Sequence, residues 1–274
     1  MGYAMTGLLI RGQLVPVSGH DVIQPASAGG PAWAHLDPGD YRQRPALWVR
    51  QVLVHSTGGN WPMPLGPGTG PGGECRWIAD IWQSDPVHSA AQIVVDSAGT
   101  ICCLYDLAYT MAYHAEGSNP WSVGIEMYQF PDGRMMQATV DAAAACAMAI
   151  CGAFQIPFQH HGGAYGGDPL PRMETGVGHM RHNSGGPDCV GIFGHRDNTS
   201  ARGRGDPGDA IYKALVALGS ESLDFRSGED LKIARVRQMK LLSLGERLTV
   251  DGLVGPASMA AAKRQGFASW RDVA

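Results

Sequence analysis

The sequence lacks the features that mark several common protein classes. Its six cysteines form no C-x-x-C pair, which argues against a cysteine-rich zinc module and favours buried free thiols in a reducing compartment. Its longest apolar run, residues 142–154, is shorter than the roughly 20 residues that a membrane-spanning helix needs. The net charge of −4 gives no basic signature for nucleic acid. We therefore expect neither a nucleic-acid partner nor stable membrane association.

The N-terminus also lacks the shape of a signal peptide, because Arg11 interrupts the apolar stretch 7–10. We therefore expect synthesis in the cytoplasm. Residues 1–44 are rich in glycine, proline and alanine, and we interpret them as an extension that wraps the main domain or partly lacks order. Apolar residues make up 44% of the chain, which is enough for a proper hydrophobic core.

The hydrophobic pattern predicts alternating strands and helices. We expect loops at 56–73 and 159–188, and the adjacent residues Cys102 and Cys103 should point to opposite faces of their strand. The expected elements are a buried strand at 47–55, a helix at 74–84, a hairpin of 91–95 with 100–104, a strand at 122–128, a buried helix at 138–154, a strand at 191–195 and a helix at 210–218.

The composition changes after this last helix. We place a linker at 220–229 and a helical segment at 230–274, with helices at 230–242 and 257–265. The main domain then spans 45–219.

Three side chains near predicted strand ends form a candidate metal site. His55 ends one strand, His195 ends another, and Asp206 follows eleven residues later. Two neutral imidazoles and a carboxylate are common zinc ligands, and three protein ligands leave the fourth position open for water. Alternatives are that Asp197 is the third ligand and that Asp206 caps the following helix.

Several loop and aromatic residues carry further hypotheses. The pair His179-x-x-His182 invites a second metal site, although the histidines at 160, 161, 179 and 182 are more typical of an exposed loop. Trp61 and Trp82 are candidates for a sugar groove, and core packing is the alternative for Trp82.

The motifs around the candidate site occur in a characteristic order. They read VLVHST at 52–57, AYHAEG at 112–117, GIE at 124–126, GHRD at 194–197 and RGDPG at 204–208. In this order they resemble the zinc-dependent N-acetylmuramoyl-L-alanine amidases of the amidase-2 type, a family that includes peptidoglycan recognition proteins. The resemblance covers residues 45–218. It implies an α/β fold with a central mixed β-sheet flanked by helices.

The resemblance also implies roles for individual residues. His55, His195 and Asp206 fall on the family's zinc ligands. Glu126 matches a glutamate of the muropeptide amidases, and it would act as the base, because the tyrosine of some family members has no match here. A structural ion pair is the alternative for Glu126.

Two further positions match the family with a change. Arg204 stands where the family has a lysine, and this substitution keeps the charge but alters the hydrogen-bond geometry. His114 matches the histidine of a His-Ala-Gly motif, with Glu116 where glycine is usual. We expect Arg204 to assist catalysis and His114 to contact the substrate, and a satisfied core histidine is the alternative for His114.

The C-terminal segment is similar to a small helical peptidoglycan-binding domain. The motif is VDGLVGPA at 250–257, where Asp-Gly and Gly-Pro supply tight turns. A purely structural helical tail is the alternative.

Together these resemblances imply a zinc amidase that cleaves the bond between N-acetylmuramic acid and L-alanine in bacterial peptidoglycan. We expect a monomeric phage endolysin that waits in the host cytoplasm until lysis and then reaches the cell wall. The rival interpretations are a non-catalytic peptidoglycan recognition protein, a cytoplasmic muropeptide-recycling amidase and a peptidase that acts within the stem peptide.

Overall fold

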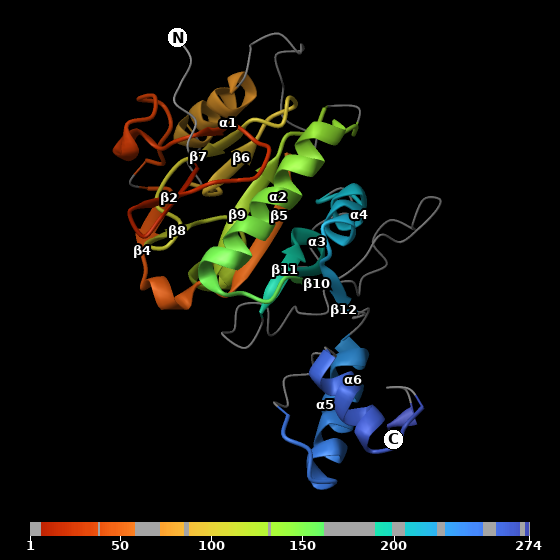
Figure 1. The fold of residues 1–274 in the computed structure, drawn as a ribbon. Helices are drawn as coiled ribbons and strands as arrows, with labels where there is room; N and C mark the ends of the chain where they lie inside the picture. Colours follow the sequence, from red (N-terminus) through yellow and green to blue (C-terminus); the bar gives the residue numbers. More distant parts are fainter. Residues whose placement is uncertain are drawn as a thin grey trace.

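The computed structural model is organised around one mixed eight-stranded sheet (Figure 1). Neighbouring strands are parallel except β6 (Ile93–Val95) and β7 (Ile101–Cys103), which form the predicted antiparallel hairpin. The expected α/β class is thereby confirmed. The strands lie in the order β12 (Glu221–Leu223), β10 (Gln159–His161), β11 (Gly191–Gly194), β5 (Gln51–Ser56), β9 (Ser122–Met127), β6 (Ile93–Val95), β7 (Ile101–Cys103) and β3 (Val22–Ile23). The structure describes residues 7–37, 39–57, 72–84, 88–130, 133–161, 190–198, 206–223, 228–248, 256–268 and 272–273.

The two faces of the sheet carry different chemistry, because successive side chains on a strand point to opposite faces. Val52 and Val54 of β5 enter the larger core cluster together with Ile125 of β9. His55 therefore lies on the other face, at the carboxyl end of its strand. In this way one strand supplies both the core and the candidate site.

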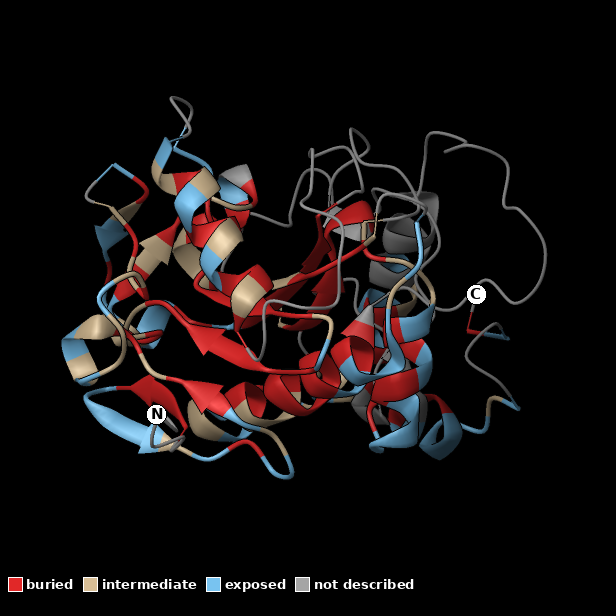
Figure 2. Ribbon diagram, turned by 90° about the horizontal axis from the view of Figure 1, so that it is seen from above, coloured by how far each residue is buried: buried red, intermediate tan, exposed pale blue. Residues whose placement is uncertain are grey.

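Helix α2 (Gln137–Phe154) is the buried alanine-rich helix that the sequence predicts. It packs against strands β5, β6, β7 and β9 and against α4 (Ala210–Ala217). Strand β1 (Leu8–Ile10) belongs to the same core cluster. Figure 2 shows α2 as a largely buried helix along the sheet. Among the described residues it is the one helix long and apolar enough to cross a membrane, and its place inside the core accounts for this composition.

Helix α1 (Gly73–Ser84) covers the opposite face of the sheet with a second core cluster. Trp82 is buried there, as core packing predicts. Cys102 belongs to this cluster and Cys103 to the cluster under α2, so the two thiols point to opposite faces as expected. The five described cysteines are all buried and free, and Cys189 lies outside the described residues.

The described N-terminal segment contributes one strand to the main sheet and three strands to two smaller ribbons. Strands β1 and β2 (Gln13–Val15) form an antiparallel hairpin, and β3 pairs with β7 in the main sheet. Strand β4 (Tyr41–Gln43) pairs with β8 (Thr110–Ala112) to form a separate two-stranded ribbon. The described part of 1–44 thus contributes to the main sheet and to its core.

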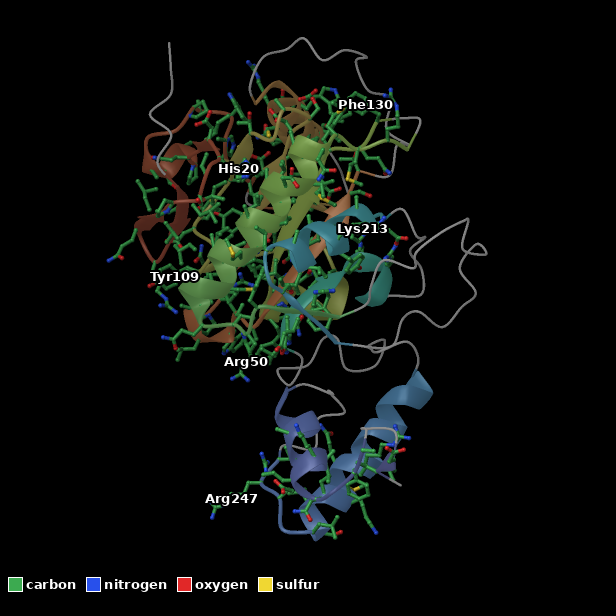
Figure 3. The ribbon with its side chains drawn as sticks, turned by 45° about the vertical axis from the view of Figure 1, so that its right-hand side comes forward. His20, Arg50, Tyr109, Phe130, Lys213 and Arg247 are labelled. Atoms are coloured by element: carbon green, nitrogen blue, oxygen red, sulfur yellow. The ribbon has the colours of Figure 1, made fainter. Side chains whose placement is uncertain are left out.

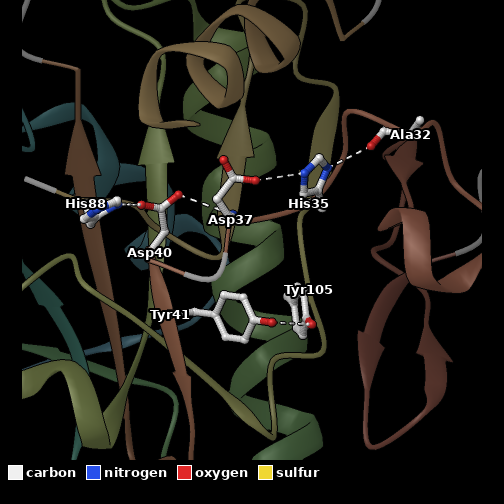
Figure 4. A network of polar contacts seen from close by, with 7 residues as sticks. All are labelled: Ala32, His35, Asp37, Asp40, Tyr41, His88 and Tyr105. Carbon is white, nitrogen blue, oxygen red and sulfur yellow. Dashed lines mark hydrogen bonds and ion pairs between the residues drawn. The ribbon is translucent and has the colours of Figure 1, made fainter. Parts of the chain in front are cut away.

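Polar contacts hold the chain that leads into β4 (Figure 4). Oδ1 of the buried Asp40 lies 3.0 Å from Nδ1 of His88, and Oδ2 accepts a hydrogen bond from the Asp37 amide at 3.3 Å. Burial raises the pKa of Asp40, while the hydrogen bond to His88 acts in the opposite direction. The hydroxyls of Tyr41 and Tyr105 lie 2.9 Å apart. These contacts anchor β4 before the chain reaches β5.

Two predicted elements differ locally from the structure. The strand expected at 47–55 begins only at Gln51, because η2 (Ala46–Trp48) forms a short 3-10 turn after Pro45. The segment 220–229, predicted as a linker, contains β12, which pairs with β10 in the main sheet. The ordered sheet therefore extends into the predicted linker.

The predicted loop 159–188 also begins with a strand, and its remainder from residue 162 lies outside the described residues. Its first three residues form β10, and His160 is buried rather than exposed. Its Nδ1 atom lies 2.9 Å from Oγ of the buried Ser220. Burial lowers the pKa of His160 to about 4. The expectation of an exposed loop histidine was therefore wrong at this position, because long-range parallel pairing brings a polar segment into the sheet.

Helices α5 (Gly228–Ser243) and α6 (Pro256–Arg264) form a small group with a core of their own. Leu241 of α5 and Ala261 of α6 share this core cluster with Val273. In Figure 3 Arg247 points outward from the turn that follows α5. A further contact joins α6 to the same turn, since Arg264 pairs with Glu246 at 2.6 Å.

Candidate metal centre

The sheet brings His55 and His195 together. Strands β5 and β11 are parallel, with Val54 opposite Gly194, so the residues that follow these two lie side by side. His195 begins the short helix α3 (His195–Asn198). The Nδ1 atoms of His55 and His195 are 2.9 Å apart, and the two residues are only 3% and 5% exposed. The two histidines predicted as ligands are therefore neighbours in a buried position.

Asp206 completes the cluster. Its Oδ2 atom lies 3.0 Å from Nδ1 of His195, and its Oδ1 atom accepts a hydrogen bond from the Ser56 amide at 3.0 Å. A backbone hydrogen bond also joins the segments that carry His195 and Asp206, since the Arg196 amide donates to the Asp206 carbonyl at 2.6 Å. Asp206 does not cap α4, whose N-cap residue is Asp209. Its carboxylate instead points toward the two histidines.

These three side chains fit a divalent metal ion. One ligand atom from each of His55, His195 and Asp206 lies within 4.8 Å of the others. In a tetrahedral zinc site with Zn–N bonds of about 2.0–2.1 Å, neighbouring ligand atoms are about 3.3 Å apart, close to the observed 2.9 and 3.0 Å. Two imidazoles and one carboxylate also match the donor chemistry of zinc. A zinc ion held by these three side chains would have its fourth coordination position open to a non-protein ligand.

Glu126 stands beside the cluster on the neighbouring strand. In the pairing of β5 with β9, His55 lies directly opposite Glu126, so both side chains project from the same face of the sheet. Glu126 is partly exposed, whereas its strand neighbours Ile125 and Met127 are buried. A carboxylate at this position is adjacent to the three candidate metal ligands without being one of them.

His114 is half-buried and lies next to His55. Its Nδ1 atom is 3.0 Å from Nε2 of His55, and its Nε2 atom is 3.1 Å from Oγ of Ser122. Burial lowers the pKa of His114 to about 3, and the charges of His195 and Arg44 act in the same direction. The structure thus gives both ring nitrogens partners within the protein, as expected of the alternative role of a satisfied histidine, and the substrate contact stays a prediction.

The ring of His114 occupies space that a missing side chain provides. A Cβ atom at Gly124 would lie 2.7 Å from Cγ of His114. The backbone of this turn is held by Asn119, whose Oδ1 atom accepts hydrogen bonds from the amides of His114 at 3.0 Å and Ala115 at 2.6 Å. Gly124 belongs to the GIE motif, but only the tertiary structure shows that its missing side chain leaves space for the His114 ring.

Arg44 is a buried cation close to this group. Its guanidinium donates to the carbonyls of Leu107 at 2.8 Å and Asn119 at 3.1 Å, and also to the carbonyl of Ser122. Burial lowers the pKa of Arg44 to about 9. Sequence reasoning missed this residue because its acceptors are backbone carbonyls 63 to 78 positions away, which leave no local signature.

Several predicted participants lie outside the described residues. These are Arg204, the pair His179 and His182, Trp61, and the side chain of Asp197. Of the predicted site residues, the structure brings together His55, His195, Asp206, Glu126 and His114.

The sequence identifies the family to which this fold and site belong. Residues 43–209, more than half of the chain, match the amidase-2 family, described as N-acetylmuramoyl-L-alanine amidase. The chain is therefore a member of the amidase-2 family of N-acetylmuramoyl-L-alanine amidases. The matched region contains all three candidate metal ligands.

Solved structures with low sequence identity resemble the chain. An endolysin N-acetylmuramoyl-L-alanine amidase from Clostridium intestinale is 11% identical, with a TM-score of 0.42, over 75% of this chain and 100% of that one. The Staphylococcus aureus hydrolase AmiA is 10% identical, with a TM-score of 0.41, over 73% and 86%. The Drosophila peptidoglycan recognition protein SA is 16% identical, with a TM-score of 0.38, over 75% and 95%. No curated protein sequence matches the chain.

Proposed function

We propose that this chain is a zinc-dependent hydrolase of bacterial peptidoglycan. It would cleave the amide bond between the lactyl group of N-acetylmuramic acid and the L-alanine of the stem peptide. The observation that carries the proposal is the convergence of His55, His195 and Asp206 within 4.8 Å, inside the region that matches the amidase family. A protein that only binds peptidoglycan has no need for three converging metal ligands.

The residues around this cluster supply the rest of the chemistry. Zinc held by His55, His195 and Asp206 would polarise the scissile carbonyl and lower the pKa of a water molecule. Glu126 is positioned beside His55, where it can accept a proton from the attacking water and pass it to the departing L-alanine nitrogen. One C–O bond forms and the C–N bond breaks, which yields a lactyl carboxylate and a free amino terminus.

Arg204 is assigned to the stabilisation of the negative charge that develops on the carbonyl oxygen. This assignment rests on its position in the RGDPG motif, two residues before Asp206. Donors of this kind contribute about 2.7–4 kcal/mol to transition-state stabilisation.

Digestion of purified peptidoglycan tests the proposed reaction. The full chain is incubated with sacculi, with and without a chelator, and the new termini are identified by mass spectrometry. We expect released stem peptides with a free N-terminal L-alanine, and no release after chelation. Binding to sacculi without any release would instead identify a recognition protein, and cleavage elsewhere in the stem would identify a peptidase.

Two variants separate the proposed roles. Asp206→Ala should lose both zinc content and activity, because it removes a ligand. Glu126→Gln should retain zinc but lose activity by a factor of about 10²–10⁴, the usual contribution of general acid–base catalysis. Full activity in either variant would refute the corresponding assignment.

A further inference from the structure

A chain of hydrogen bonds runs from the protein interior to the back of His55. Oγ of Ser122 donates to the Ser118 carbonyl at 2.7 Å and lies 3.1 Å from Nε2 of His114. Nδ1 of His114 lies 3.0 Å from Nε2 of His55. The other ring nitrogen of His55, Nδ1, faces His195. Two groups, the Ser122 hydroxyl and the His114 ring, therefore connect a backbone carbonyl to a candidate metal ligand.

The hydroxyl of Ser122 determines which atom donates and which accepts in each of these hydrogen bonds. A hydroxyl group has a single hydrogen, and that of Ser122 is directed to the Ser118 carbonyl. Its oxygen can therefore only accept from His114, so Nε2 of His114 carries a hydrogen. A neutral imidazole carries one hydrogen, so Nδ1 of His114 accepts a hydrogen bond from Nε2 of His55. Nδ1 of His55 then carries no hydrogen, and its lone pair is directed at Nδ1 of His195.

We propose that Ser122 and His114 are positioning residues that hold His55 in the Nε2–H tautomer and so direct its Nδ1 lone pair at the metal. This inference rests on the proposed zinc site. Histidine ligands of metals almost always donate their second ring N–H to a neighbouring group, and loss of that partner costs 10–100-fold in metal affinity or activity. Here the partner is a second histidine, whose own tautomer Ser122 determines.

Two serine-to-alanine variants of the protein form a matched pair for the test. Ser122→Ala removes the acceptor for His114. Ser220→Ala is the control, because it removes a similar contact of 2.9 Å between the buried Ser220 hydroxyl and Nδ1 of His160 on β10. We expect Ser122→Ala to weaken zinc binding roughly 10–100-fold in chelator competition, and Ser220→Ala to leave it within about threefold. In the zinc-free protein, ¹⁵N NMR should find His55 in the Nε2–H tautomer, with Nδ1–H populated in Ser122→Ala.

Variants of His114 provide a second measurement. In His114→Asn the amide oxygen can accept from His55 in place of Nδ1, whereas His114→Leu has no acceptor. We expect Asn to retain most of the zinc affinity and Leu to lose it.

The proposal is overturned if Ser122→Ala keeps both the zinc affinity and the His55 tautomer of the natural protein, or if Ser220→Ala weakens zinc binding equally. These outcomes are independent of the reaction. A protein with the predicted tautomer and zinc affinity that releases no L-alanine termini would refute the proposed function alone.

Discussion

At the scale of single residues, the candidate metal centre depends on the absence of a side chain at Gly124 as well as on its candidate ligands. Gly124 lies under the ring of His114, where a Cβ atom would be 2.7 Å from Cγ. The ring cannot retreat easily, because His55 and Ser122 hold its two nitrogens. A small residue in the strand thus decides where a histidine from another element can lie.

Gly124→Ala should therefore displace His114 and destabilise the protein by about 1–3 kcal/mol, the usual cost of overpacking a filled site. Gly152 in α2 is a matched control, since a Cβ atom there meets nothing within 4 Å. Alanine at this exposed helical position should stabilise the protein by about 0.5–1 kcal/mol. Urea denaturation of the two variants measures both effects, and equal stabilities would contradict the packing described for Gly124.

At the scale of elements, Arg44 joins segments that are distant in sequence. It follows β4 and binds the carbonyl of Leu107 before β8, a carbonyl within η3 (Glu116–Trp121) and the carbonyl of Ser122, the first residue of β9. The buried guanidinium thereby fixes the turn that carries His114 relative to the strand that carries Glu126. Its pKa of about 9 leaves it charged at neutral pH.

Arg44→Met should destabilise the fold by roughly 3 kcal/mol or more, because several buried carbonyls would each lose a partner at about 1–3 kcal/mol. Arg42 is the control two residues earlier. It is exposed and lies 5.8 Å from the ring centre of Tyr113, so Arg42→Met should cost at most about 1 kcal/mol. Chemical denaturation of both variants provides the comparison, and a small loss for Arg44→Met would show that the carbonyls find other partners.

At the scale of the whole molecule, the candidate metal site joins three separate parts of the chain. His55 ends β5, His195 follows β11, and Asp206 precedes α4. Their separations of 140 and 11 residues mean that the site exists only when the central sheet has formed. A metal ion bound there links folding to binding.

Zinc should therefore stabilise the folded protein. At a free concentration of 100 times the dissociation constant the gain is about 2.7 kcal/mol, which a thermal melt with and without zinc will detect as a higher Tm. Asp206→Ala should melt at the same temperature in both conditions. A zinc-independent Tm in the natural protein would exclude His55, His195 and Asp206 as a zinc site under these conditions.

Much of the architecture could be predicted from local patterns. The helix at 138–154 and the hairpin around residues 96–99 were expected within a few residues of α2, β6 and β7, because apolar periodicity and turn residues act locally. Strands β10 and β12 were not expected. Each has three residues and owes its existence to parallel partners far away in the chain.

The amino-acid sequence by itself determined the family, the mixed α/β class and the set of possible ligands, because motifs record which residue types are present and in which order. Only the tertiary structure decided which groups touch. It turned His114 toward His55 and Ser122, buried Arg44 among carbonyls, and directed Asp206 to His195 instead of to a helix end. The physical reason is that hydrogen-bond partners and buried space are properties of long-range packing, which no local pattern encodes.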